Sequence, residues 1–247
     1  MSGFIRDNGL GSPRNRGCFY ACHDVLKNLT GVALIGHTIL FEALDEGAIR
    51  AFAALARNNS SNHLLMGEHN AVRQFWNNYA VKGESPRLIH PVLFLQRHDL
   101  FNNQRLVDGL RLATPNDLEQ VVGAQAAMAF ETSGVNPLTK DPAGFRERYL
   151  RRIEKNRVWV LTKHGHLIFK ADVTSESEEV AYLEGVYVKP DERGKGLGRD
   201  CVKAIGNILL QRKQAIYLFV AQDNARLQSF YFNLGFNVAG HYDLLYF

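Results

Sequence analysis

Arg193-Gly194-Lys195-Gly196-Leu197-Gly198 is the stretch that decides the fold of this chain. It follows an apolar run, 181–188, that predicts a strand ended by Pro190, and it leads into the helical pattern of 197–212. Alternate glycines let the backbone approach a ligand closely, and a helix start offers unpaired N–H groups and a positive dipole end. This order of strand, glycine loop and helix predicts a phosphate site. The alternative is a tight turn with exposed basic residues.

Two common nucleotide-binding motifs do not fit this loop. A Walker A loop requires the pattern GxxxxGK[ST], which the sequence lacks. A dinucleotide-binding fingerprint requires GxGxxG and an acidic residue about 20 positions further on. Here the glycines are spaced GxGxG and follow an arginine. The loop therefore predicts a phosphate-bearing ligand that is held in another way.

Hydrophobic periodicity and turn residues outline the rest of the chain. We expect a flexible tail over 1–17, an N-terminal α/β domain over 18–108 and a second domain over 109–247. The boundary is placed in the polar segment 99–108. Strands are predicted over 32–41, 63–66, 91–96, 109–113, 158–162, 167–173, 181–188, 216–220 and 236–247, and helices over 45–57, 71–81, 114–130, 144–155, 197–212 and 225–234.

A second motif lies downstream of the glycine loop. Asn224 is followed seven residues later by Tyr231 and then by Gly235 and Phe236. Seven residues return an α-helix to about the same face. Together with the R-x-x-G-x-G-like loop, this run resembles the GNAT N-acetyltransferases over residues 109–247. The first hundred residues more weakly resemble a poorly characterised domain found ahead of some of these enzymes.

The resemblance implies an α/β (α+β) fold, with a mixed, mostly antiparallel central sheet flanked by helices, in tandem with a smaller GNAT-like N-terminal half. It implies that acetyl-coenzyme A is the co-substrate and that a primary amine attacks it directly in a ternary complex. The coenzyme would be held by the loop, by two positions of the preceding strand and by one asparagine: Val186, Val188, Arg193, Gly194, Lys195, Gly196, Leu197, Gly198 and Asn224. The alternative is a non-catalytic coenzyme A-binding or regulatory module on the same scaffold.

Catalytic roles follow from the chemistry of acetyl transfer. The resemblance implies that backbone N–H groups near Val186 and Val188 form an oxyanion hole, and that Tyr231 is the general acid for the departing thiolate. A protonated amine must also lose a proton. We prefer Glu184 as the base, because strand alternation puts it on the same face as Val186 and Val188. Glu131 and Asp172 are weaker candidates. Alternatively, Tyr231 is a core aromatic, Asn224 a helix N-cap and Glu184 a solvent-facing carboxylate.

The N-terminal half contains a weak repeat of the C-terminal half. Residues 63–71 resemble 217–225, so that Asn70 aligns with Asn224, while Asn77 stands where the second copy has Tyr231. The first copy has no glycine loop. As a second copy of the fold it would be a degenerate one, and we do not expect it to bind coenzyme A. Its expected role is to cover the acceptor site or to stabilise the catalytic half.

Composition excludes several other classes of protein. The chain has 247 residues, of which 46% are apolar and 22% charged, with a net charge of +4, as in a globular protein. No apolar run reaches the roughly 18 residues of a membrane helix, and we see no secretion signal. Three cysteines make no disulfide framework. We therefore expect a cytoplasmic protein, a monomer or homodimer, whose partner is a small-molecule or peptide amine and neither a membrane nor a nucleic acid.

Two further clusters, one of basic residues and one of Cys and His, are compatible with other functions. The basic run around 146–157 could serve a nucleic-acid groove, but it lacks aromatic interleaving, and a solvated helix face is the preferred interpretation. Cys18, Cys22 and His23 lie close enough in sequence to bind a metal. They lack a fourth ligand at a plausible spacing, so no metal is predicted.

Overall fold

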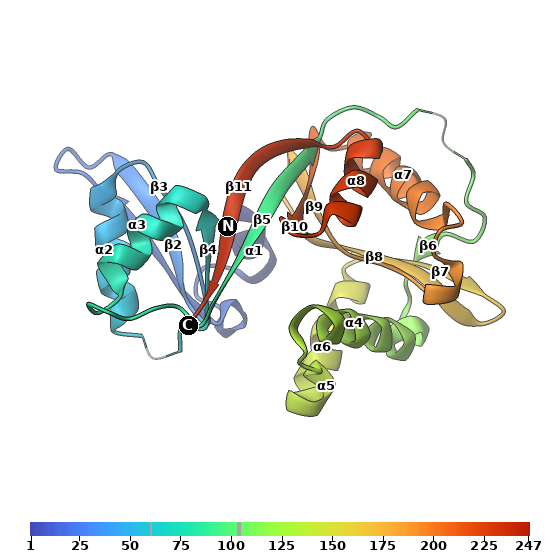
Figure 1. Ribbon diagram of the computed structural model, residues 1–247, viewed down its shortest axis with the longest axis horizontal. Helices are drawn as coiled ribbons and strands as arrows, with labels where there is room; N and C mark the ends of the chain where they lie inside the picture. Colours follow the sequence, from blue (N-terminus) through green and yellow to red (C-terminus); the bar gives the residue numbers. More distant parts are fainter. Residues whose placement is uncertain (60, 103–104) are drawn as a thin grey trace. The chain divides into compact units, whose positions relative to one another are not determined.

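The computed structural model of the chain describes residues 1–59, 61–102 and 105–247. Two compact units emerge (Figure 1). Unit 1 comprises residues 1–95, 219–229 and 237–247, and unit 2 comprises 96–218 and 230–236. This division differs from the predicted boundary at residue 108, because the C-terminal segments 219–229 and 237–247 belong to unit 1. Asn103 and Gln104 of the polar boundary segment lie outside the described residues.

The sheet of unit 1 has the strand order β1-β2-β3-β4-β11-β5. β1, β2 and β3 are successively antiparallel, β3 and β4 are parallel, and β11 is antiparallel to β4. The last strand of the chain therefore lies beside a strand of the N-terminal half (Figure 1). The bounds are β1 (Gly17–His23), β2 (Leu29–Gly36), β3 (Thr38–Ala43), β4 (Leu64–Glu68), β5 (Leu88–Arg97) and β11 (Asn237–Tyr246).

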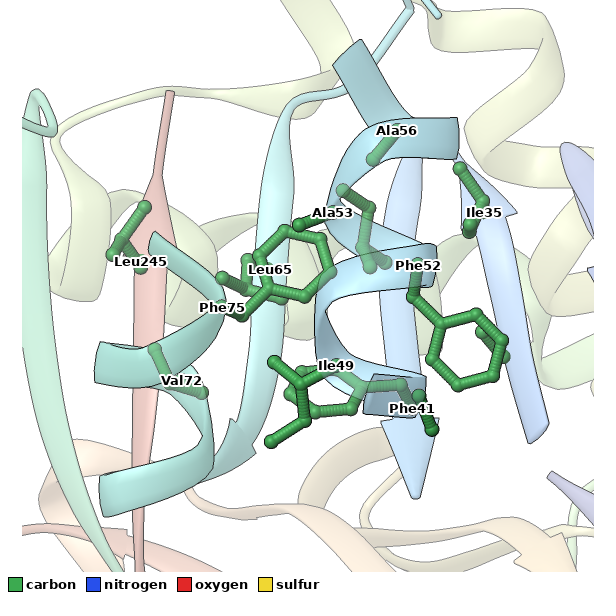
Figure 2. Close-up of a cluster of buried hydrophobic side chains, with 13 residues drawn as sticks. Ile35, Phe41, Ile49, Phe52, Ala53, Ala56, Leu65, Val72, Phe75 and Leu245 are labelled. Atoms are coloured by element: carbon green, nitrogen blue, oxygen red, sulfur yellow. The ribbon is translucent and has the colours of Figure 1, made fainter. Parts of the chain in front are cut away.

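Two amphipathic helices, α2 (Glu46–Arg57) and α3 (His69–Tyr79), pack against this sheet. Phe52 of α2 and Phe75 of α3 are fully buried, together with Leu65 of β4 and Leu245 of β11 (Figure 2). Burying each such side chain contributes about 1.5–3 kcal/mol. Leu245 shows that the end of the chain completes the core of the N-terminal half.

The N-terminus, predicted as a flexible tail, contains two short helical elements. Residues 1–16 include helix α1 (Ser2–Asn8) and the 3₁₀ turn η1 (Pro13–Asn15). Asn15 is buried, and its Nδ2 donates to the carbonyl of Gly9 at 2.8 Å. Glycines and polar residues predicted a flexible tail here; the asparagine side chain adds hydrogen bonds from the turn to the carbonyls of Gly9 and Leu10.

The sheet of unit 2 has the strand order β10-β9-β8-β7-β6. Its neighbours are antiparallel except for β9 and β10, which are parallel. In Figure 1, α4 and α6 lie on one side of β8 and β9, and α7 lies on the other. The predicted α/β fold with a mixed, mostly antiparallel sheet is confirmed. The bounds are β6 (Arg111–Leu112), β7 (Val158–Lys163), β8 (His166–Glu176), β9 (Val180–Val188), β10 (Ala215–Ala221), α4 (Leu118–Ser133), α5 (Pro137–Lys140), α6 (Pro142–Glu154), α7 (Leu197–Leu210) and α8 (Ala225–Asn233).

The same order of elements occurs twice along the chain. The series β2-β3-α2-β4-α3-β5 is repeated as β8-β9-α7-β10-α8-β11. In each copy an antiparallel pair is followed by a helix and by a parallel pair that matches three residues, 38–40 with 64–66 and 180–182 with 215–217. This agreement extends the weak sequence repeat to the architecture and supports a GNAT-like N-terminal half.

Candidate active site

The site is built around two parallel strands that pair only at their beginnings. Residues 180–182 of β9 pair with Ala215, Ile216 and Tyr217 of β10. β9 then continues to Val188, paired with β8 on its other side. Among the described residues, no pairing with β10 is found for 183–188. Unpaired backbone N–H and C=O groups of a strand need partners, and an extended ligand can supply them.

A β-bulge interrupts β9 in this part of the strand. Glu184 lies opposite Asp172 and Tyr187 lies opposite Lys170, so Gly185 and Val186 together face a single residue of β8. Gly185 has φ +60°, which favours glycine. A Cβ at this position would also lie 2.9 Å from atoms of both Asp172 and Lys170.

The bulge corrects the predicted alternation. Because Lys170 and Asp172 share one face of β8, Glu184 and Tyr187 share that face of β9. Val188 lies opposite Phe169 and therefore faces the other side. Strand alternation had placed Glu184 on the same face as Val188. The extra residue of the bulge reverses this relationship.

The glycine loop opens helix α7 without a side-chain cap. Gly194 and Gly196 have φ +78° and +84°, and Gly196 is the N-cap residue, which makes no side-chain cap hydrogen bond. In α2, by contrast, Asp45 Oδ1 accepts from Ala48 N at 2.8 Å. The first N–H groups of α7 are therefore available to an anion, whereas α2 carries its own carboxylate.

The third glycine of the loop has a packing role. A Cβ on Gly198 would lie 3.0 Å from Cγ2 of Val188, which is closer than side chains normally approach. Gly198 thus lets the first turn of α7 lie against the end of β9. This close approach places the helix N-terminus beside the part of β9 that β10 leaves unpaired.

Residues 129–236 match the model described as the acetyltransferase (GNAT) family. This segment is a GNAT-family domain. No curated protein matches the sequence at a significant level. Many solved structures share the fold, among them the following three. A GNAT-family acetyltransferase from Colwellia psychrerythraea has a TM-score of 0.62 at 14% identity, covering 100% of this chain and 90% of its own. A GCN5-related N-acetyltransferase from Sphaerobacter thermophilus has a TM-score of 0.60 at 11% sequence identity. The match covers 94% of this chain and 80% of that protein. A tandem GNAT protein from the clavulanic acid biosynthesis pathway has a TM-score of 0.58 at 14% sequence identity. The match covers 93% of this chain and 82% of that protein.

The basic residues of the GNAT loop differ in their surroundings. Arg193 donates from Nε to the carbonyl of Val188 at 2.9 Å, and its Nη2 lies 3.9 Å from Glu131. Lys195 pairs with Glu192 at 3.1 Å. Arg199 pairs with Asp200 at 2.8 Å. Arg193 therefore fixes the loop to β9. The other two form solvent-exposed pairs, which are weak and leave their cations able to reorient.

Tyr231 of the GNAT domain is buried on α8. Its ring packs edge-on against Phe230 and Phe236, at centroid distances of 5.0 Å and 5.5 Å. Burial raises the pKa of Tyr231 above its ordinary value, so the hydroxyl keeps its proton at neutral pH. Asn224 belongs to unit 1, where its Oδ1 accepts from Leu227 N at 3.0 Å and caps α8.

The three carboxylates proposed as bases lie in different environments. Glu184 is exposed on the face of β9 that carries Tyr187. Glu131 is exposed near the end of α4. Asp172 is fully buried and paired with Lys170 at 2.9 Å and with Arg152 at 3.2 Å. Two cations hold its carboxylate, so Asp172 is the least suited of the three to exchange protons with a substrate.

The buried cluster beside the bulge was not predicted from the sequence. It comprises Lys170, Asp172, Gln125, Tyr149 and Arg152. One signal was present. Lys170 and Asp172 stand two residues apart in the apolar run 167–173, so a strand there puts opposite charges side by side on one face. Such a pair in an otherwise buried strand indicates an internal ion pair.

The two other clusters identified in the sequence lie on α6 and on β1. The arginines of α6 pair with carboxylates: Arg146 with Glu119, Arg148 with Asp141, Arg151 with Glu147 and Arg152 with Asp172. Cys18, Cys22 and His23 lie on β1, and within the described part of the chain no group of three or more His, Cys, Asp or Glu could hold a metal ion. None of the helices in 1–59, 61–102 and 105–247 is long and apolar enough to cross a membrane.

Proposed function

We propose that the chain is an N-acetyltransferase that moves an acetyl group from acetyl-coenzyme A to a primary amine. One observation carries the proposal. The uncapped N-terminus of α7, entered through Gly194 and Gly196, lies beside the half of β9 that β10 leaves unpaired. A phosphate-bearing ligand with an extended arm fits both features, because the helix start binds phosphate and the strand pairs with the arm.

The residues present suit the coenzyme. The pyrophosphate would be held by N–H groups of the loop and of the first turn of α7, assisted by Lys195 and Arg199. A Cβ on Gly194 would meet no atom within 4 Å, so the loop leaves open space for a ligand. The pantetheine arm would pair with Val186 and Val188 of β9. When bound, the co-substrate supplies an acetyl thioester.

The side chains around β9 would then carry the proton transfers. The amine nitrogen forms a bond to the acetyl carbon while the carbon–sulfur bond breaks. Glu184, which is exposed although the bulge turns it to the face opposite Val188, would accept the proton that the amine loses, directly or through water. The N–H of Val186 donates to the carbonyl oxygen as negative charge develops there. Tyr231, whose hydroxyl keeps its proton at neutral pH, protonates the departing sulfur.

Unit 1 would bind no coenzyme in this scheme. The helix of the first copy that corresponds to α7 is α2, and Asp45 caps its N-terminus with a carboxylate. A second anion there would meet like charge and would find Ala48 N already engaged. We therefore propose one coenzyme for each chain.

Two measurements on the intact 247-residue chain test the proposal. Acetyl-coenzyme A at a hundredfold excess over Kd should stabilise the protein by about 2.7 kcal/mol, visible as a rise in Tm. A panel of amines should then include at least one that accelerates thiol release from acetyl-coenzyme A. The absence of a Tm shift at millimolar concentration would overturn the coenzyme assignment. A Tm shift with no thiol release across the panel would instead indicate the non-catalytic binding module.

A further inference from the structure

Lys170 is a charged residue buried without any exposure in the middle of the GNAT domain. Its ammonium group makes three hydrogen bonds, to Gln125 Oε1 at 2.8 Å, to the carboxylate of Asp172 at 2.9 Å and to the carbonyl of Gly185 at 3.0 Å. An ammonium group has three donors, so all of them are used. A fully satisfied buried charge fixes the groups around it in place.

These three partners come from different elements. Gln125 lies on α4, Asp172 on β8 beside Lys170 itself, and Gly185 at the bulge of β9. Asp172 also accepts from Arg152 of α6, which in turn donates to the hydroxyl of Tyr149. Burial lowers the pKa of Lys170, and the charge of Asp172 opposes this effect. Asp172 thus favours the charged ammonium, while Lys170 holds the bulge through its bond to the Gly185 carbonyl.

The contact with Gly185 determines where the next amide points. The chain contains no cis peptide bond among its described residues, so the peptide between Gly185 and Val186 is trans. In a trans peptide the C=O and the N–H point in opposite directions. Since the Gly185 carbonyl points to Lys170, the N–H of Val186 points away from the Lys170 ammonium. The positive φ of Gly185 gives the chain this local turn.

We propose that Lys170 is a positioning residue, which holds the Gly185–Val186 peptide so that the Val186 N–H meets the acetyl carbonyl. This inference rests on the proposed function. Lys170 acts through the backbone and does not contact the substrate. Its role explains why a lysine, rather than an apolar residue, occupies a fully buried position on β8: the bulge interrupts the pairing of β8 and β9, and Lys170 supplies a donor to the Gly185 carbonyl there.

The carbonyl group of the acetyl thioester reports on this contact directly. The infrared band of ¹³C-labelled acetyl-coenzyme A should move to lower frequency on the wild-type protein, because a hydrogen bond to Val186 polarises the bond. In Lys170→Met most of this displacement should be lost, and kcat should fall at least about tenfold, since an oxyanion donor is worth roughly 10²–10³ in kcat. The Kd of coenzyme A, which has no acetyl group, should stay within about threefold.

Two further variants separate positioning from general destabilisation. Arg152→Met breaks the same buried cluster but leaves the Lys170–Gly185 contact intact. It should lower Tm while preserving the displaced carbonyl band. Lys170→Met/Asp172→Asn removes both charges, so that no carboxylate remains buried without its lysine partner. It should show the same loss of band displacement and of kcat as Lys170→Met. It also covers the case in which Lys170→Met does not fold.

The possible outcomes are distinct. A wild-type carbonyl band and wild-type kcat in the Lys170 variants would overturn the positioning role and leave the proposed function intact. Equal loss of band displacement in Arg152→Met would also overturn it, because the cluster would then act only as a structural support. Failure of the wild-type protein to bind acetyl-coenzyme A at all would instead count against the proposed function.

Discussion

Arg193 donates a hydrogen bond from Nε to the carbonyl of Val188, over 2.9 Å, and so ties the glycine loop to the end of β9. Val188 is also the residue against which Gly198 packs. The last residue of the strand therefore contacts both ends of the loop. This arrangement couples the two parts of the proposed coenzyme site, because a shift of the loop would shift the strand end as well.

Replacing Arg193 should therefore affect the coenzyme differently from replacing Lys195. Arg193→Ala removes the bond to Val188 and should raise the Kd of coenzyme A at least about tenfold, at low and at high salt. Lys195 is an exposed residue paired with Glu192, so Lys195→Ala should raise Kd by less, and the effect should shrink as salt screens its charge. Calorimetric titration at two salt concentrations measures both. If both variants lost the same affinity for coenzyme A, and if this loss shrank at high salt, Arg193 would contribute only through its charge.

Gly194 and Gly165 form a matched pair for testing the loop. Both have φ +78°, and a Cβ on either would meet no atom within 4 Å. Each glycine-to-alanine change should cost about 1–2 kcal/mol of unfolding free energy, because side chains disfavour this conformation. Only Gly194→Ala should also weaken coenzyme binding, by about tenfold or more, since Gly165 lies in the turn between β7 and β8. Urea unfolding and ligand titration separate the two effects. If Gly194→Ala and Gly165→Ala bound coenzyme A equally well, the loop would not be part of the coenzyme site.

Asp117 supplies a test of the fold that is independent of the coenzyme. The Arg111 guanidinium lowers the pKa of Asp117 to about 2, although burial opposes this effect. A carboxylate whose pKa is depressed in the folded state stabilises the protein above its unfolded pKa, near 3.8, and loses this contribution as the pH falls towards 2. Asp117→Asn should therefore lose about 1–2 kcal/mol at pH 7, with a smaller loss below pH 4.

Denaturant titrations between pH 3 and pH 7 measure this dependence. Glu119→Gln is the control, because its pair with Arg146 is exposed and should change the free energy of unfolding little at any pH. A loss for Asp117→Asn that does not change between pH 7 and pH 3 would mean that the capping hydrogen bonds to Thr114, and not the charge, account for the stability.

The parts of the site that sequence alone predicted are those fixed by local chemistry. Pro190 ends a strand, and Gly194 and Gly196 supply the backbone conformations that enter a helix. These signals lie within a few residues of one another, and the fold class followed from them through the family resemblance. The secondary-structure order of the second half could be read from periodicity for the same reason.

The parts that could not be predicted depend on contacts distant in sequence. Lys170 meets Gln125 only after α4 has folded over the sheet. The bulge at Gly185 reverses the faces of β9; an isolated glycine in a strand suggests a bulge, but it does not fix the register on either side. The pairing of β11 with β4 joins the end of the chain to its first half, which no local pattern encodes.

Tyr231→Phe tests the proposed general acid. The change removes one oxygen and keeps the ring between Phe230 and Phe236, so the Kd of acetyl-coenzyme A should stay within about threefold of wild type. A proton donor to the leaving thiolate contributes about 10²–10⁴-fold, so kcat should fall at least about tenfold. Loss of kcat without loss of binding is the pattern of an interaction made in the transition state.

Tyr149→Phe is the matched control, because Tyr149 is also a buried tyrosine of the GNAT domain, and its hydroxyl accepts from Arg152. Its kcat should stay within about threefold of wild type, although its Tm should fall. Background hydrolysis of acetyl-coenzyme A can serve as the assay where the amine is not yet identified. If Tyr231→Phe turned over at the wild-type rate while chemistry limited kcat, Tyr231 would be a packing residue. The thiolate would then take its proton from water or from another side chain.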